Sequence, residues 1–153
     1  MTTRAIQFLK RKKIPFEVIR YKHDEKGAVF ASRAIDIPLG KTVKTLVADL
    51  GSNKYLLVLA PGHRRVSPKC LAKACGVKRT ALSDPATAER ITGYKVGGIS
   101  PFGTRHALPV IMEAALLNHD KVAINGGQRG IMLVMSPVDI LRAVNGKAGI
   151  ILE

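Results

Sequence analysis

The sequence is poor in the residue types that most often carry chemistry. Among its 153 residues there are no tryptophans, two cysteines and four histidines. Cys70 and Cys75 lie on one short predicted helix at a spacing that turns them to different faces, so we expect free thiols instead of a disulfide or a two-cysteine metal clip. The histidines have no His-x-x-x-His spacing, and none is near the cysteines. We therefore expect no metal site and no cofactor.

Recognisable catalytic motifs are also absent. The 11 Asp and Glu residues are not paired in the sequence, which disfavours two-carboxylate chemistry. There is no P-loop, and no G-x-G-x-x-G opens a helix after a strand. Gly98-Ile99-Ser100 begins like a G-x-S-x-G nucleophile elbow, but Phe102 stands at the fifth position and Pro101 has no backbone N–H for an oxyanion. An enzyme with this sequence works without an obvious protein nucleophile.

Long apolar runs are missing as well. No stretch reaches the roughly 18 residues of a membrane span. The first basic cluster follows the apolar residues near the start, which is opposite to a secretory signal, so we expect a cytoplasmic protein without membrane contact. Apolar residues make up 46% of the chain, enough for one core. We expect a single domain over residues 1–153.

What the sequence has in excess is positive charge. Lys and Arg number 25 against 11 acidic residues, a formal net charge of +14. Such a balance predicts a polyanionic partner, and nucleic acid is favoured over a membrane surface because no basic stretch carries large exposed apolar residues. Three tyrosines and four phenylalanines are too few for broad base stacking, so a few nucleotides at an RNA end fit best. The cations are dispersed along the chain: Lys10 to Lys13, Lys41, Lys44, His63 to Arg65, Lys78, Arg79, Arg105, His106 and Arg129.

Helix and strand signals alternate in the first part of the chain. Thr3 can cap a helix that ends near Lys12. A strand is expected over residues 14–21, with Ile14, Phe16 and Val18 on one face, and a helical turn over 31–35. Residues 43–50 and 55–60, joined by Gly-Ser-Asn-Lys, form the clearest predicted hairpin.

Three later segments each combine an N-cap side chain, a proline at the first helical position and a terminating glycine. They run from Ser67 to Gly76, from Asp84 to Gly93 and from Ser136 to Gly146. Apolar strand candidates lie at residues 78–82, 108–114, 121–125 and 131–135. Hairpin-like connections dominate, so we expect an α/β (α+β) fold with a mixed, largely antiparallel, barrel-like sheet flanked by short helices.

Five segments resemble, in order and spacing, the YbaK family, the free-standing relatives of the editing domain inserted in prolyl-tRNA synthetase. They are Tyr21 with His23 and Asp24, VKTLV at 43–47, Asp84-Pro85, TGYKVGGISPFG at 92–103, and INGGQRG at 124–130. The resemblance covers nearly the whole chain. It implies an editing-domain fold and hydrolysis of misacylated tRNA, typically cysteine or alanine attached to the proline tRNA. The implied partners are the 3′ acceptor end of tRNA and prolyl-tRNA synthetase.

The same resemblance implies a set of site residues. Lys44 matches the functional lysine and is the expected catalytic residue, with Thr45, Tyr21 and Phe30 at substrate-contacting positions. The Gly-rich loop with Gly97, Gly98 and Pro101 would line the pocket for the terminal adenosine and its aminoacyl group. The second loop contributes Asn125, Gly126, Gly127 and Met132. Such chemistry relies on positioning and on the substrate itself, which agrees with the missing nucleophile.

Two positions depart from the cysteine-clearing pattern. Asn125 replaces a serine and Met132 replaces an aspartate, and Met132 makes the pocket more apolar. Deacylation of Cys-tRNA(Pro) is the leading hypothesis. Deacylation of tRNA carrying alanine, serine or threonine, and tRNA binding without turnover by a regulatory homologue, both stay open.

Overall fold

The computed structural model describes residues 2–22 and 28–153, and the side chains of all of these except residues 28–30. The predicted site residue Phe30 therefore lies outside the described side chains, and His23 and Asp24 lie outside the described residues. The helices are α1 (Arg4–Arg11), α2 (Ala28–Ile35), α3 (Pro68–Cys75), α4 (Pro85–Thr92) and α5 (Pro137–Val144), with 3-10 turns η1 (Leu39–Lys41) and η2 (Ala114–Asn118).

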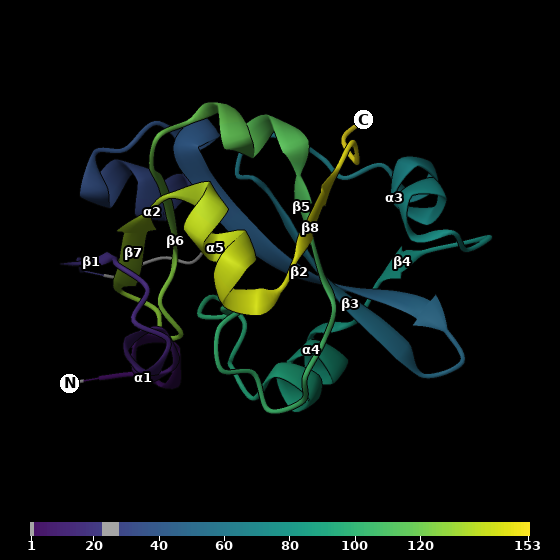
Figure 1. Ribbon diagram of the computed structural model, residues 1–153, viewed down its shortest axis with the longest axis horizontal. Coiled ribbons are helices and arrows are strands. Elements are labelled where there is room, and N and C mark those ends of the chain that lie inside the picture. The colour runs from purple at the N-terminus through teal and green to yellow at the C-terminus, as the bar shows by residue number, and fades with distance from the viewer. Residues whose placement is uncertain (1, 23–27) are drawn as a thin grey trace.

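One mixed sheet organises the described chain (Figure 1). Its strands are β1 (Glu17–Arg20), β2 (Thr42–Gly51), β3 (Lys54–Pro61), β4 (Ala81–Leu82), β5 (Val110–Glu113), β6 (Val122–Asn125), β7 (Ile131–Met135) and β8 (Lys147–Gly149). The order is β1-β7-β6-β2-β3-β5-β8, with β4 paired to β2. The pairs β1/β7, β6/β7, β2/β3 and β2/β4 are antiparallel, while β2/β6, β3/β5 and β5/β8 are parallel. The predicted fold class is confirmed.

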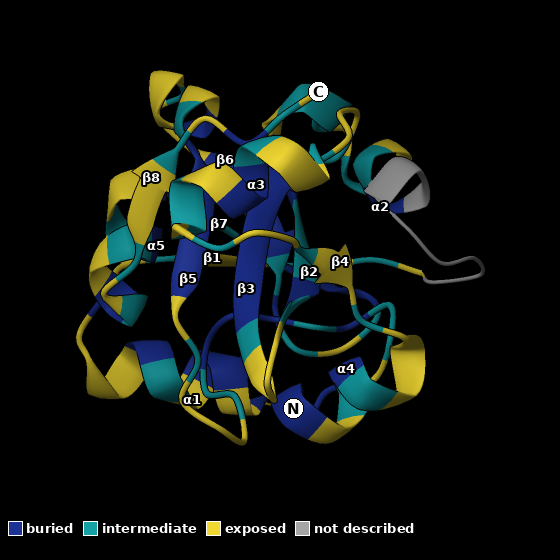
Figure 2. Cartoon of the chain, turned by 90° about the vertical axis from the view of Figure 1, so that its right-hand side faces the viewer, coloured by how far each residue is buried: buried dark blue, intermediate teal, exposed yellow. Residues whose placement is uncertain are grey.

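The predicted central hairpin is confirmed with nearly its expected bounds. Strands β2 and β3 pair from Val43↔Pro61 to Gly51↔Lys54. Ser52 and Asn53 have φ values of 55° and 59°, the left-handed conformation that a two-residue hairpin turn requires at both positions. Strand β3 is buried along most of its length behind α3 (Figure 2), which explains why its sequence is apolar on both faces.

The helix ends follow the capping chemistry at five of the seven cap and end positions that the sequence predicts. Thr3 Oγ1 accepts from Ile6 N at 3.1 Å and starts α1. Ser67 and Asp84 cap α3 and α4 by accepting from Cys70 N and Thr87 N. Gly76 and Gly93 end these two helices in the left-handed conformation. These five predicted caps and ends therefore need only residues close in sequence.

Helix α5 differs at both ends from the prediction. Ser136 makes no side-chain capping bond, and the left-handed residue is Asn145 (φ 51°) instead of Gly146. Asparagine tolerates this conformation better than other non-glycine residues. Gly146 has a separate constraint, because a Cβ there would lie 3.0 Å from Leu141 Cδ2.

The prediction was least accurate for edge strands. The first strand is only Glu17–Arg20, and Val18 is 39% exposed instead of facing the core with Ile14. Strand β1 pairs only with β7 among the described residues, so one of its two edges has no neighbouring strand there. Strand β4 has two residues where five were expected, and β8 was not predicted. The Lys-Ala-Gly sequence of β8 has no apolar alternation, so only its pairing with β5 defines it as a strand.

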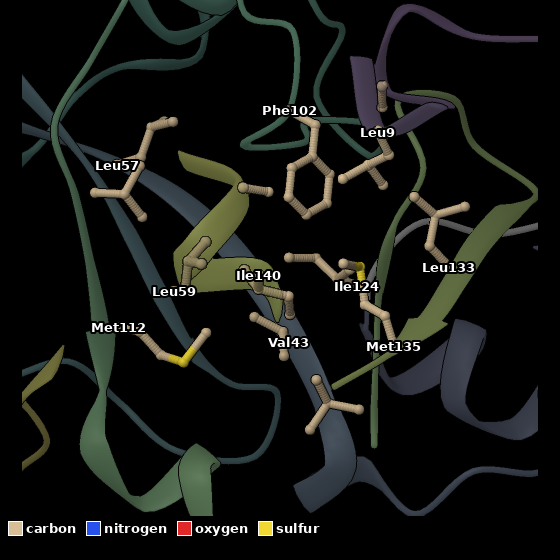
Figure 3. Packing of buried hydrophobic residues seen from close by; sticks show 14 of the residues in the cluster. Leu9, Val43, Leu57, Leu59, Phe102, Met112, Ile124, Leu133, Met135 and Ile140 are labelled. Atoms are coloured by element: carbon tan, nitrogen blue, oxygen red, sulfur yellow. The ribbon is translucent and has the colours of Figure 1, made fainter. Parts of the chain in front are cut away.

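Both faces of the sheet are covered. The larger cluster joins β-strand side chains to α1, α4 and α5 and includes Leu9, Leu57, Phe102, Ile124 and Ile140, which point toward one another in Figure 3. On the opposite face, Leu71 of α3 packs with Leu56, Val58 and Ile111. A third cluster places Ala31 of α2 against Ala123 and Met132. No helix within the described residues is long and apolar enough to cross a lipid bilayer.

Candidate functional site

A cavity of about 450 Å³ lies beside the middle of β2. Its walls come from strands β2, β6 and β7, from the start of α4, and from the loop that follows α4. The lining residues are Tyr21, Ala31, Thr42 to Val47, Gly62, Leu82, Ser83, Pro85, Ala88, Val96, Gly97, Ile99, Asn125, Arg129 and Met132. The cavity therefore collects residues that are distant in the sequence.

A gap in the strand pairing creates this space. Strand β2 pairs with β6 only at Thr42↔Ala123 and Val43↔Ile124. On the same side, pairing with β4 begins at Ala48↔Leu82, and Ser83 N donates to Val47 O at 2.9 Å. In the described structure, residues 44–46 have no neighbouring strand on that side. The cavity occupies the fork between β6 and β4, where the edge of β2 is open to a ligand.

Lys44 lies on this open segment and is half-buried. Burial, and to a smaller extent the positive charge of Arg65, lowers the pKa of Lys44 below the ordinary lysine value of 10.5. Both causes disfavour the ammonium form, so an anion that enters the cavity would relieve them. Lys44 is thus placed to bind a phosphate or an oxygen with developing negative charge.

Thr45, the next residue, presents a hydroxyl without a protein partner. Thr45 Oγ1 is buried and makes no hydrogen bond. A buried hydroxyl without a partner costs free energy, and most are paired in folded proteins. Because Thr45 lines the cavity, a bound ligand with a polar atom can supply the missing bond.

The opposite wall consists of two loops that bind each other. Asn125 Nδ2 donates to Gly97 O at 2.9 Å, and Asn125 Oδ1 accepts from Gly127 N at 2.8 Å. Arg129 packs over Gly97, where an added Cβ would lie 3.0 Å from its Nε atom. The Asn125 amide nitrogen thus joins the two loops, while its amide oxygen fixes the turn of its own loop, so both polar groups of the side chain are engaged.

The glycines of this wall are required by the protein's own packing. A Cβ at Gly98 would lie 3.0 Å from Gln128 Cα, and one at Gly127 would lie 2.9 Å from Tyr94 Cε1. A Cβ at Gly126 would lie 2.7 Å from Ile131 Cγ2. A larger residue at any of these positions would force a neighbour to shift, and at Gly98 that neighbour is the backbone of the other loop.

Hydrogen bonds to buried residues hold the GGISPFG segment in place. The Tyr94 hydroxyl donates to Phe102 O, and Phe102 N donates to Ser100 Oγ at 3.1 Å. Ser100 and Phe102 are fully buried. Burial raises the pKa of Tyr94 to about 12, with a smaller opposing effect of Arg4, so this hydroxyl stays protonated and available as a donor.

The structure brings most of the sequence-predicted site residues to one cavity. Six of them line it: Tyr21, Lys44, Thr45, Gly97, Asn125 and Met132. Gly98, Gly126 and Gly127 are not among the lining residues and pack closely against the protein's own atoms, and Pro101 borders a different cavity. Their positions are those of supporting residues.

Three polar lining residues were not selected from the sequence: Arg129, Ser83 and Thr42. Arg129 entered the prediction only as one of many dispersed cations, although a basic residue inside a Gly-rich loop is a usable signal for an anion site. Ser83 and Thr42 carry no such signal, because only the fork in the sheet brings them together.

The chemistry available in the cavity is electrostatic. Lys44 and Arg129 are its cations, and no Asp, Glu, His or Cys is among its described lining residues. No group of three or more potential metal ligands occurs within the described residues. Such a site can hold and orient an anionic or ester-containing group, and its described lining offers cations and hydroxyl groups for that purpose.

Comparisons with known proteins agree with this architecture. The family model of the aminoacyl-tRNA editing domain matches residues 24–143. A protein of Enterococcus faecalis (strain ATCC 700802 / V583), provisionally named Cys-tRNA(Pro)/Cys-tRNA(Cys) deacylase EbsC, is 26% identical over 147 residues, covering 95% of this chain and 90% of that protein. The uncharacterised Bacillus subtilis (strain 168) protein YwhH is 26% identical over 110 residues, covering 72% of this chain and 69% of that protein.

Solved structures share the fold. The crystal structure of a provisionally assigned trans-editing enzyme for prolyl-tRNA synthetase superimposes with a TM-score of 0.89 at 22% identity, covering 98% of this chain and 95% of that chain. The crystal structure of a hypothetical protein superimposes with a TM-score of 0.92 at 20% identity, covering 99% of this chain and 100% of that chain.

Proposed function

This chain belongs to the aminoacyl-tRNA editing domain family, and from that premise we propose that it is a trans-editing deacylase that releases a wrong amino acid from tRNA, with Cys-tRNA(Pro) as its leading substrate. The family acts on aminoacyl-tRNA, and EbsC is named for the cysteine substrate. A deacylation assay with different amino acids and tRNAs tests which amino acid is released and from which tRNA.

The observation that carries the proposal is the combination of an open strand edge, the Lys44 ammonium and the unpartnered Thr45 hydroxyl in one cavity. The terminal nucleotide of tRNA offers a phosphate for the cation. The aminoacyl ester offers a carbonyl oxygen and an amine to the edge of β2. An ester already activated by its ribose needs orientation and charge stabilisation more than a protein nucleophile.

In the proposed mechanism the substrate supplies the attacking group. The thiol sulfur of the attached cysteine bonds to the ester carbonyl carbon, the carbon–oxygen bond to the ribose breaks, and the thiol proton passes to the released ribose oxygen. Lys44 holds the adjacent phosphate and stabilises the negative charge that develops on the carbonyl oxygen. The interlocked loops of Gly97 and Asn125 provide a wall that fixes the 3′ end.

The test is deacylation of a panel of labelled aminoacyl-tRNAs: Cys, Ala, Ser, Thr and Pro on the proline tRNA, and Cys on its own tRNA. Wild-type protein should release cysteine from the proline tRNA fastest, and Lys44→Met should lower this rate by about 100-fold, the scale typical of removing one charge-stabilising group. Lys54→Met, an exposed lysine at the other end of the same hairpin, is the matched control. Equal rates for wild type and Lys44→Met would remove Lys44 from the mechanism.

A second candidate function follows from Asn125 and Met132. Both polar groups of the Asn125 side chain are hydrogen-bonded to backbone atoms of the protein, and Met132 is buried against Ala31 and Ala123. Neither residue therefore offers a free polar group to a substrate. Tight, salt-sensitive tRNA binding without turnover of any panel member would favour a binding protein. Release of alanine, serine or threonine in preference to cysteine would instead make the chain a deacylase for another amino acid. Adding prolyl-tRNA synthetase to the same assay tests it as the partner.

A further inference from the structure

A second cavity of about 630 Å³ lies between α1, the loop of residues 101–108 and the end of α5. It shares no lining residue with the first cavity. No Asp or Glu is among its described lining residues, and four of those residues are cations: Arg4, Arg11, Lys12 and Arg105. The first cavity, by comparison, has only two cations among its described lining residues, Lys44 and Arg129.

Three of these cations are held in place by contacts that leave their charge available. The Arg4 guanidinium lies 5.9 Å from the centre of the Tyr94 ring, and Lys12 Nζ lies 5.2 Å from the centre of the Phe8 ring. Arg105 Nη1 donates to Arg90 O at 3.4 Å. The two ion pairs found among the described residues involve other side chains. Cations that are oriented but not neutralised lose less entropy when they bind an anion.

Helix stabilisation is the alternative explanation for this cluster. Arg11 is in the last turn of α1, and Arg4 packs against Gly93 at the end of α4, where an added Cβ would lie 2.8 Å from Arg4 Nη1. Positive charges at helix C-termini are stabilising. That explanation accounts for Arg4 best, because it is the residue in contact with a helix end. It does not account for a cavity with cations on both sides and no carboxylate.

The position of the cavity favours RNA phosphates as its ligand. The loop that contributes Gly97 to the first cavity contributes Pro101 to the second. Four residues of extended chain span at most about 14 Å, so these two lining residues, one from each cavity, lie within that distance of each other. A polynucleotide whose 3′ end occupies the first cavity has further phosphates close to this segment, and phosphates bind best to clustered Arg and Lys.

We propose that the second cavity is an additional RNA-binding site, which binds backbone phosphates of the tRNA outside its 3′-terminal nucleotide through Arg11, Lys12 and Arg105. The proposal rests on the proposed function only in taking tRNA as the polyanion. The site contributes affinity for the tRNA body and takes no part in the bond-breaking step.

The test is direct binding of an unacylated proline tRNA transcript to the full chain over a range of salt concentrations. The double variant Arg11→Gln/Lys12→Gln removes two exposed cations of the cavity. Lys69→Gln/Lys73→Gln removes two exposed cations of α3 and is the charge-matched control. A short oligonucleotide, a dinucleotide that ends in the tRNA 3′-terminal adenosine, is the second probe, because it is too short to occupy both cavities. Thermal unfolding of each variant is measured in parallel.

The cavity variant should bind the transcript about tenfold more weakly and reduce the slope of log K against log salt by about 1.5, the value for two lost phosphate contacts. Its affinity for the short oligonucleotide should be unchanged, and the control should alter both affinities little. An unchanged transcript affinity with a lower unfolding temperature would mean that the cations only stabilise helix ends. An equal loss in the control would mean a general charge effect, and either result overturns the proposal. A wild-type protein that deacylates nothing but shows the expected binding difference would refute the proposed function and keep this site.

Discussion

The two walls of the first cavity use polar groups in opposite ways. On the loop wall, Asn125 makes hydrogen bonds to Gly97 and Gly127. Tyr94, Gln128 and Ile131 occupy the space next to the glycines of this wall. On the strand wall, the Thr45 hydroxyl has no partner and the Lys44 ammonium is disfavoured by burial. The polar groups of the loop wall are paired within the protein, whereas those of the strand wall are available to a ligand. Substitutions in the first should therefore affect stability and those in the second should affect activity.

The largest expected effect on stability is that of Gly127→Ala. Gly127 has φ +96°, and a Cβ there would lie 2.9 Å from Tyr94 Cε1. The left-handed backbone and the overlap together should cost about 3 kcal/mol, which lowers the unfolding temperature by about 9 °C. Calorimetry or thermal circular dichroism measures this.

Gly51→Ala is the matched control for this substitution. Gly51 has φ +86° and no atom within 4 Å of the added Cβ, so it isolates the backbone cost of about 1 kcal/mol. Equal losses for the two variants would mean that the loops are not tightly interlocked.

Asn125→Asp should cause the next largest loss of stability. The introduced carboxylate can still accept from Gly127 N, but it cannot donate to Gly97 O and instead faces that oxygen. We expect a loss of about 2 kcal/mol at neutral pH, measured by denaturant unfolding.

The loss should shrink in acid, because a protonated carboxyl regains a donor for Gly97 O. Asn118→Asp, on exposed η2, should change stability by less than about 0.5 kcal/mol. A loss independent of pH would show that the bond to Gly97 O is not the cause.

Lys44→Met should leave stability within about 0.5 kcal/mol of wild type at neutral pH, in contrast with its effect on deacylation. Because the pKa of Lys44 is lowered in the folded protein, the unfolded chain binds more protons between that pKa and 10.5. Wild-type stability should therefore rise relative to Lys44→Met as the pH increases through this window. Unfolding at several pH values from 7 to about 10.5 measures the trend, and a fall with pH would contradict the burial of the ammonium.

The smallest expected effect is that of Arg65→Ala on Lys44. Removing this charge should raise the pKa of Lys44 but leave it below 10.5, because burial is the larger cause of the shift. Titration followed by NMR of ε-¹³C-labelled lysine measures it. Arg64→Ala is the control, since Arg64 Nη2 donates to Glu153 O at 2.9 Å and is not among the causes of the shift. Identical titrations for the two variants would mean that Arg65 does not act on Lys44.

Much of the fold could be predicted from local sequence. The caps at Thr3, Ser67 and Asp84 and the turn at Ser52-Asn53 were found because each depends on residues within three positions. Strand β7 was predicted with its observed bounds from apolar content alone. The edge strands β1, β4 and β8 were predicted poorly or missed, because a neighbouring strand defines them more than their own residues do.

The candidate site divides along the same line. Motif similarity selected Lys44, Thr45 and Asn125, and the fold places all of them in one cavity. Motif similarity did not indicate which glycines line the cavity and which pack only against the protein itself. Packing distances to Gln128, Tyr94 and Ile131 decide that, and these contacts form only after the two loops meet.

The sequence by itself determined most of the helix ends, the central hairpin and the excess of positive charge, since each is a property of composition or of neighbouring residues. The tertiary structure alone decided where β2 leaves β6, which opens the strand edge beside Lys44 and Thr45. It also decided that Asn125 joins loops 28 residues apart and that Arg4, Arg11 and Arg105 border one cavity. Such features arise from contacts between distant segments, whose geometry the folded core sets.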